Sequence, residues 1–244
     1  MWSDGLVLVL SALAGSIASV TGFGIGSLLT PVLSLDVETR LAVAAVSIPH
    51  VIGTAVRFWL LQGRVDRRVL WNFGLTSAAG GLVGAALGTW ASNRWLTVLF
   101  AILLLFAALS EVSGLSRRMR FTGHVAWVAG ALSGLLGGTV GNQGGIRSAA
   151  LLGFDLSKES FVATATAIAL FVDGARMPVY IATQHAELLD LWRWIAFAAA
   201  GVTLGTVFGS RVLVRMPDQW FRRVLAVVLA VLGGWMLVRP LTTT

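Results

Sequence analysis

The sequence contains no cysteine, only three histidines and few charged residues, which make up 12% of its 244 positions. Without cysteine there is no disulfide, no thiol nucleophile and no thiolate metal site. The three histidines are scattered along the chain, so they do not predict a metal cluster. No carboxylate pair and no serine–histidine constellation occurs at a spacing that an enzyme uses, so we expect no catalytic site, no metal and no cofactor.

Apolar residues dominate what is present, with 57% of the chain and a mean hydropathy of +0.84. Soluble globular domains do not have this composition. Most apolar segments reach the ~20 residues that a transmembrane helix needs. They run at about 5–35, 41–62, 69–92, 95–115, 121–154, 160–183, 191–214 and 220–238. The sequence therefore predicts an all-α, polytopic helical bundle that spans the lipid bilayer of the cell membrane, which in a bacterium is the inner membrane.

The net charge of +7 does not indicate a nucleic-acid partner. The basic residues lie in short loops beside apolar segments, where the positive-inside rule places them. The stretch Met1–Asp4, in front of the first segment, contains no basic residue. A cleaved signal peptide starts with a basic region, so none is expected here.

Two glycine-rich stretches interrupt the apolar pattern. Gly137–Arg147 reads GGTVGNQGGIR, and Thr21–Ser27 reads TGFGIGS. Each glycine lowers helix propensity by roughly 1 kcal/mol, so the clusters predict helix breaks. At membrane depth, the backbone groups that a break frees are tolerated only where protein or a polar cavity covers them. The paired breaks therefore indicate a ligand site.

The chain consists of two similar halves, 1–112 and 125–244, joined by a basic linker at 113–124. Arg57 and Arg176 occupy the same register, 119 residues apart. Each half also has a double GxxxG pattern, formed by Gly80, Gly84 and Gly88 and by Gly201, Gly205 and Gly209. Such glycines let two helix backbones approach closely, either within the chain or between the copies of a homodimer. We predict four membrane segments in each half, the first of them broken.

These features resemble the TauE/SafE sulfite exporter family, also called the toluenesulfonate uptake permease family. The resemblance covers nearly the whole chain. It rests on the break in each half, on Pro31 after the first break, and on the turns at Asp36 and Asp155 that lead into alanine-rich helices. It implies an integral membrane carrier of small sulfur-containing or organic anions. The second half departs from the family pattern, because Asn142–Gln143 interrupts the glycines and Ile146–Arg147 stands where the approach to a proline is expected.

Arg147 is the residue most strongly indicated as a substrate ligand. A charge at membrane depth costs at least about 2.5 kcal/mol, so it requires a partner or a function. A helix starting near Gly144 offers free N–H groups to an anion, and the forked guanidinium matches sulfonate or carboxylate oxygens. The alternative places Arg147 near the surface, paired with Asp155 or Glu159. The other predicted substrate contacts at the breaks are Asn142, Gln143, Gly144, Gly145, Gly24, Gly26 and Ser27.

Four more candidate substrate-binding residues lie in the second segments of the two halves. Asp173 and Arg176 are three residues apart on one helix face and predict an intrahelical ion pair. Arg57 is interpreted as an interfacial residue that snorkels, and the alternative places both arginines at the rim of an anion path. His50 either contacts the anion or titrates near neutral pH, or it lies buried, neutral and hydrogen-bonded.

The basic residues favour one of two topologies. If every segment crosses the membrane, the basic residues outside it divide equally between the two sides. If each broken segment turns at its break and returns, the halves become inverted repeats, with both termini outside and the linker inside. The inside then holds eleven basic residues: Arg64, Arg67, Arg68, Arg117, Arg118, Arg120, Lys158, Arg211, Arg215, Arg222 and Arg223. The outside holds four, Arg40, Arg94, Arg193 and Arg239, so the positive-inside rule favours the inverted repeats.

Together these features predict a secondary transporter of a small anion, bound near the midplane at the paired breaks. The candidate substrates are sulfite, thiosulfate, a sulfonate and a small organic acid. Two alternatives belong to other classes, an anion channel and a membrane-embedded enzyme. An inside-negative potential favours anion export by about 2.3 kcal/mol per charge per 100 mV. Export or facilitated diffusion therefore needs no coupling ion, and the sequence contains no evident sodium site.

Overall fold

The computed structural model describes residues 3–22, 24–114, 123–141, 144–209 and 218–242, which form helices joined by short turns. The first half contains α1 (Asp4–Thr21), α2 (Ile25–Leu33), α3 (Thr39–Leu61), η1 (Gln62–Arg64), α4 (Arg67–Val69), η2 (Leu70–Gly74), α5 (Leu75–Trp90) and α6 (Asn93–Ser113). The second half contains α8 (His124–Val140), α9 (Gly144–Leu151), η3 (Leu152–Phe154), α10 (Lys158–Asp190), α11 (Trp192–Leu204), η4 (Gly205–Gly209) and α13 (Asp218–Thr242).

The predicted all-α membrane protein is confirmed. Five helical stretches in the described residues are long and apolar enough to cross a membrane: Asp4–Thr21, Thr39–Arg64, Arg67–Trp90, Asn93–Ser113 and Glu159–Asp190. His124–Val140, Trp192–Phe208 and Arg223–Val238 are apolar but shorter. Large apolar side chains cover the outside of the bundle, with Trp90 89% and Trp95 72% exposed. Such a surface is stable against lipid rather than water.

Glycines in the left-handed conformation end the first helix of each half. Gly22 has a φ of 81° and donates its N–H to the Ala18 carbonyl, which ends α1. Gly141 has a φ of 73° and donates its N–H to the Gly137 carbonyl, which ends α8. Glycine adopts this conformation without the steric cost that a Cβ imposes. The predicted breaks are thus present, and the short helices α2 and α9 follow them.

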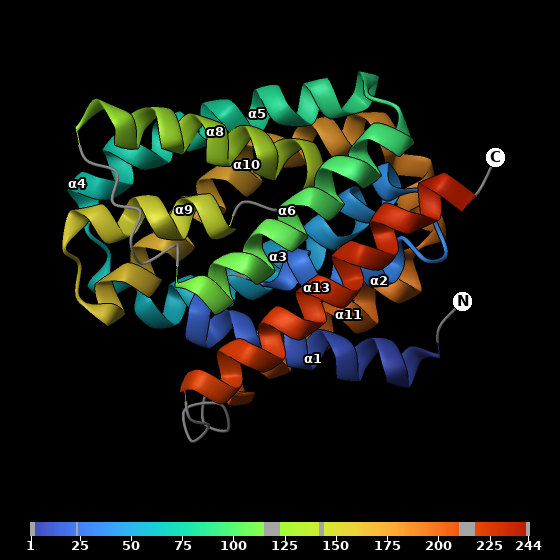
Figure 1. Ribbon diagram of the computed structural model, residues 1–244, viewed down its shortest axis with the longest axis horizontal. Helices are drawn as coiled ribbons and strands as arrows, with labels where there is room; N and C mark the ends of the chain where they lie inside the picture. The colour runs from blue at the N-terminus through green and yellow to red at the C-terminus, as the bar shows by residue number, and fades with distance from the viewer. Residues whose placement is uncertain (1–2, 23, 115–122, 142–143, 210–217, 243–244) are drawn as a thin grey trace.

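The two halves run in opposite directions in the bundle (Figure 1). At the right-hand end of the view, α1 begins and α13 ends, whereas α8 begins at the left-hand end. Both α2 and α9 double back after their breaks. Helices of one half also pack against helices of the other: α5 packs on α8, α11 packs on α1, and α6 packs on α13. This arrangement agrees with the predicted inverted repeat, which stays a prediction together with its orientation across the membrane.

The GxxxG glycines pack against the broken helices of the same chain. A Cβ built on Gly84 would lie 2.0 Å from the Leu135 carbonyl oxygen of α8, and one on Gly205 would lie 1.9 Å from that of Ala12 in α1. At these points the helix backbones are in direct contact. Helices of the same chain therefore occupy these glycine faces. The predicted homodimer stays a prediction.

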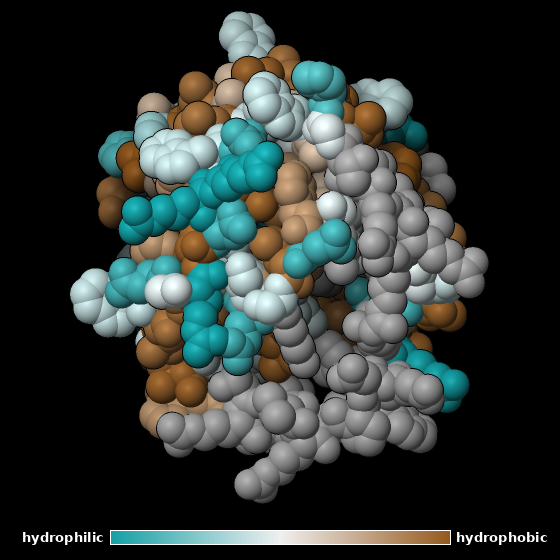
Figure 2. All heavy atoms as spheres, turned by 90° about the vertical axis from the view of Figure 1, so that its left-hand side faces the viewer, coloured by the Kyte–Doolittle hydropathy of each residue, from teal (hydrophilic) through white to brown (hydrophobic). Residues whose placement is uncertain are grey.

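Figure 2 views the left-hand end of Figure 1, where hydrophilic residues gather between apolar ones. The turn from α3 into α4 exposes Arg64, Arg67 and Arg68. Arg64 forms a surface ion pair with Glu159 at the start of α10. These residues belong to the side that the charge distribution predicts to be cytoplasmic.

The predicted topology is testable with single cysteines, because the native chain has none. Intact cells carrying Ser3→Cys, Ser116→Cys or Thr243→Cys are treated with an impermeant thiol reagent. We expect the first and third variants to react and Ser116→Cys to stay protected until the cells are opened. Eight full crossings put all three positions on one side, so identical labelling would contradict the inverted repeats. Ser116 and Thr243 lie outside the described residues.

Candidate functional site

The two helix breaks lie against each other near the middle of the bundle. Gly26, the second residue of α2, packs on the break of the other half, where an added Cβ would lie 2.5 Å from the Gly141 carbonyl oxygen. From the other side, Arg147 of α9 donates a hydrogen bond of 3.4 Å to the Gly22 carbonyl at the end of α1. Both short helices, α2 and α9, therefore start at this junction. The free N–H groups at a helix N-terminus favour an anion.

Arg57 and Arg176 make the same backbone bond in their two halves. Arg57 donates from Nη1 to the Ala18 carbonyl at 2.5 Å, and Arg176 donates from Nη1 to the Gly137 carbonyl at 2.6 Å. Each carbonyl lies 39 residues before its arginine and also accepts the N–H of the glycine that ends the helix. A guanidinium at the negative end of a helix dipole is favourable. Each arginine thus holds the end of a broken helix.

The interpretation of Arg57 as a snorkelling interfacial residue is wrong. Its side chain is buried, with 2% of the residue exposed, and Nε donates to the Thr166 hydroxyl of α10 at 2.8 Å. The two hydrogen bonds hold the guanidinium inside the bundle, at the end of α1. The contact with α10 also joins the two halves.

Asp173 is the centre of a buried polar chain. Its Oδ1 accepts from Arg176 Nε at 3.0 Å and lies 2.7 Å from Nη2, which confirms the predicted ion pair. Its Oδ2 lies 2.8 Å from Nδ1 of His50 on α3. His50 is therefore buried and hydrogen-bonded, as one of its two interpretations stated. Tyr180 extends the chain by donating to the Gly138 carbonyl, and its ring lies beneath the Arg176 guanidinium.

Arg147 is buried, with 2% of the residue exposed, so the alternative of a surface pair with Asp155 or Glu159 is wrong. Within the described part of the chain, its Nε and Nη1 have no hydrogen-bond partner. Leaving buried charged donors unpaired costs more than leaving neutral ones unpaired. A ligand with acceptor oxygens would satisfy these two donors.

We call Arg57, Arg147, Arg176, Asp173 and His50 the arginine cluster. It contains three guanidinium groups, and Asp173 is the one buried acidic residue among those the structure describes. An isolated buried ion costs several kcal/mol even after relaxation. The cluster therefore has an excess of positive charge, which a bound anion would offset.

The remaining predicted contacts lie at the starts of the short helices. Gly24 has a φ of 126° and precedes α2, whose first turn contains Gly26 and the buried Ser27. Gly144 and Gly145 open α9. Asn142 and Gln143 lie outside the described residues, so their predicted role stays a prediction.

The sequence did not single out three buried threonines. In the described residues, the hydroxyls of Thr30, Thr54 and Thr206 have no hydrogen-bond partner. Thr54 occupies in the first half the position that Asp173 occupies in the second, 119 residues later. That correspondence is the signal that could have identified it.

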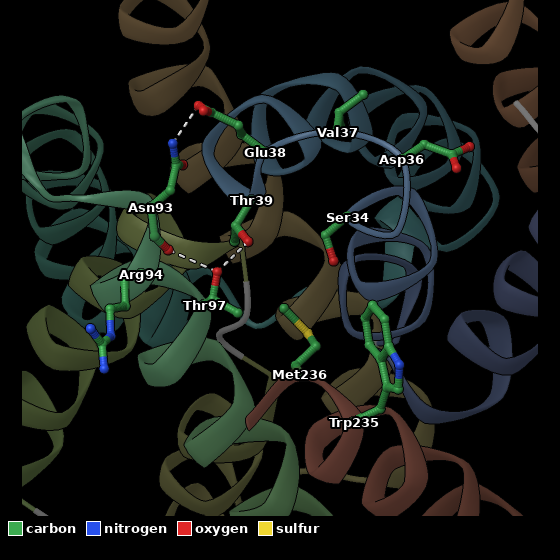
Figure 3. Close-up of a pocket in the computed structure, with 10 residues that line it drawn as sticks. All are labelled: Ser34, Asp36, Val37, Glu38, Thr39, Asn93, Arg94, Thr97, Trp235 and Met236. Carbon is green, nitrogen blue, oxygen red and sulfur yellow. Dashed lines mark hydrogen bonds between the residues drawn. The ribbon is translucent and has the colours of Figure 1, made fainter. Parts of the chain in front are cut away.

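A separate pocket of about 430 Å³ lies where α2 ends and α3 and α6 begin. Figure 3 shows Ser34, Thr39 and Thr97 around it, with the charged ends of Asp36 and Arg94 directed away from its centre. Thr39 and Thr97 bond to each other at 2.6 Å. None of the arginine-cluster residues lines this pocket, and its inward-facing groups are neutral, so it offers no charge to an anion.

The two arginine–carbonyl bonds lead to a prediction for Arg57→Lys. Lysine keeps the charge but cannot bond to Thr166 and Ala18 with the same fork. Losing a hydrogen bond from a charged donor costs about 1.5–3 kcal/mol. We expect a lower melting temperature for the purified variant than for Arg94→Lys, which changes an exposed arginine. Equal melting of the two variants would contradict the structural role of Arg57.

Comparison with protein families gives a match to the family described as Sulfite exporter TauE/SafE, over residues 7–236. Searches of curated proteins and of solved structures found no match. The matched region includes both breaks and every residue of the arginine cluster.

Proposed function

The chain belongs to the TauE/SafE sulfite exporter family, and on this basis we propose that it is a secondary transporter that carries a small oxyanion through the arginine cluster. The family is one of membrane sulfite exporters, and the helices have the length and composition of membrane spans. The candidate substrates remain sulfite, thiosulfate, sulfonates and small organic acids, and the proposed direction is export or facilitated diffusion.

The observation that carries the proposal is the unbalanced buried charge. Three guanidinium groups face one carboxylate in the described interior, and Arg147 has two nitrogens without partners there. The desolvation cost of such a group is offset when an oppositely charged ligand arrives with good hydrogen bonds. An oxyanion has several acceptor oxygens, so it can bond to Arg147 and to free helix N–H groups together.

The arrangement of the cluster also suits alternating access. Arg147 of the second half bonds to the end of α1, and Gly26 of the first half packs on the second break. A ligand held at this junction contacts elements of both halves. Broken helices that meet near the membrane midplane are the binding sites of several classes of secondary transporter. Rocking of one half against the other would then expose the anion to either side.

Flux measurements in liposomes test this proposal. Purified protein is reconstituted, and uptake of labelled sulfite and thiosulfate is followed against protein-free liposomes. A carrier moves the anion unchanged and saturates with anion concentration. A channel instead gives large currents that do not saturate, and an enzyme alters the anion chemically. Absence of protein-dependent movement of both anions would contradict the proposal.

A further inference from the structure

We propose that anion movement through this chain is coupled to a proton carried on His50. The inference rests on the proposed transport function and adds its coupling ion. It starts from a buried titratable pair, His50 and Asp173, whose nitrogen and oxygen lie 2.8 Å apart. The two residues come from α3 and α10, so this hydrogen bond links the two halves of the chain.

The second oxygen of Asp173 determines which form the pair adopts. Arg176 contacts Oδ1 through both Nε and Nη2, at 3.0 and 2.7 Å. An ion pair of this kind keeps Asp173 ionised, so Oδ2 accepts a hydrogen bond from the Nδ1–H group of His50. With Nδ1–H fixed in this way, the exchangeable proton of His50 is the one on Nε2. Histidine is the side chain whose charge ordinarily changes near neutral pH.

The charges around His50 couple this proton to the anion. Asp173, whose Oδ2 lies 2.8 Å from Nδ1 of His50, favours a charged imidazole, whereas the positive charges of Arg176 and Arg57 oppose it. An anion that binds Arg147 offsets part of this repulsion. Anion and proton therefore favour each other's binding, and such coupling is reciprocal. Couplings of this type change affinity by about 5- to 150-fold.

The same pair connects the proton to a helix break. Asp173 is shared by His50 and Arg176, and Arg176 holds the Gly137 carbonyl at the end of α8. A proton on His50 strengthens the attraction between His50 and Asp173. This attraction competes with the ion pair between Asp173 and Arg176. The end of α8 thus responds to the proton. One proton moving with a doubly charged anion leaves a net negative charge, so an inside-negative potential still favours export.

Thiosulfate is the appropriate probe, because it does not bind a proton near neutral pH, whereas sulfite does. Liposomes containing the purified protein and a pH-sensitive dye are clamped at zero potential, and a thiosulfate gradient is applied. We expect thiosulfate entry to acidify the interior. With one proton per anion, an inward proton gradient of about one pH unit should drive thiosulfate accumulation about tenfold. In His50→Gln, any remaining thiosulfate movement should carry no proton. The matched control is His185→Gln, at an exposed position of α10, and it should behave like the wild type.

Three other outcomes would contradict the proton coupling, the role of His50 or the transport function. Thiosulfate movement without acidification in the wild type overturns proton coupling and leaves the transport function intact. Proton movement that persists in His50→Gln overturns the assignment to His50. If neither sulfite nor thiosulfate moves through the wild type, the transport function fails, and the coupling fails with it.

Discussion

Replacing Arg147 by alanine is expected to abolish anion transport while the protein still folds. The variant removes the buried guanidinium whose Nε and Nη1 have no partner among the described residues. Losing a buried charged donor to a charged ligand costs about 2–5 kcal/mol. Since 1.4 kcal/mol corresponds to a factor of ten, transport efficiency should fall by about 30-fold to more than a thousand-fold.

Two further variants separate the role of Arg147 from a general loss of charge. Arg147→Lys keeps the charge but not the guanidinium, so we expect weakened transport rather than none. Arg193→Ala removes an exposed arginine that pairs with Asp4 at the bundle surface, and it should transport normally. Uptake by each variant is measured in liposomes and normalised to folded protein. Wild-type uptake by Arg147→Ala would exclude Arg147 as a ligand.

Adding a single methyl group at Gly84 is expected to prevent normal packing of the bundle. In Gly84→Ala the new Cβ would lie 2.0 Å from the Leu135 carbonyl oxygen, a contact that requires the backbones of α5 and α8 to separate. Overpacking of this kind costs 1–3 kcal/mol, and a rigid backbone contact places the cost at ~3 kcal/mol or above. The yield of monodisperse protein and its melting temperature should both fall.

Gly174→Ala is the matched control for this prediction. Gly174 lies inside α10, and a Cβ added there has no atom within 4 Å. Alanine favours a helix over glycine by about 0.5–1 kcal/mol, so the variant should be as stable as the wild type or slightly more stable. Equal stability of Gly84→Ala and Gly174→Ala would show that α5 and α8 are not in close contact.

The helical architecture could be predicted from local composition. Apolar segments of sufficient length predicted the membrane helices, and glycine clusters predicted the two breaks, because both properties are local. The ends of α1 and α8 at Gly22 and Gly141 follow from the freedom of glycine at positive φ. Arg57 and Arg176, which the sequence places in the same register, both bond to the end of the preceding broken helix.

Contacts between distant segments could not be predicted in this way. His50 and Asp173 are 123 residues apart in the chain. No local sequence pattern predicts that α3 and α10 bring them together. For the same reason Arg57 was interpreted as interfacial, although Thr166 and Ala18 hold it inside. Burial of a long charged side chain depends on its partners, which lie in other helices.

The buried charged residues are unevenly distributed between the two halves of the chain. Arg57 and Arg176 correspond, but Arg147 corresponds to Leu28, and Asp173 corresponds to Thr54. In both halves an arginine bonds to a helix end, whereas the partly unpaired guanidinium of Arg147 and the buried carboxylate of Asp173 belong to the second half. If the proposed anion site is correct, the second half would provide most of its charged contacts.

The most direct test of the anion site is equilibrium binding to purified protein. Melting temperature is measured with increasing sulfite, thiosulfate, a sulfonate or a small carboxylate, with chloride as the ionic-strength control. A ligand at 100 times its Kd stabilises the protein by about 2.7 kcal/mol. We predict that at least one of these oxyanions raises the melting temperature of the wild type and of Arg193→Ala but not that of Arg147→Ala. Equal stabilisation of all three proteins, or of none, would contradict an oxyanion site at Arg147.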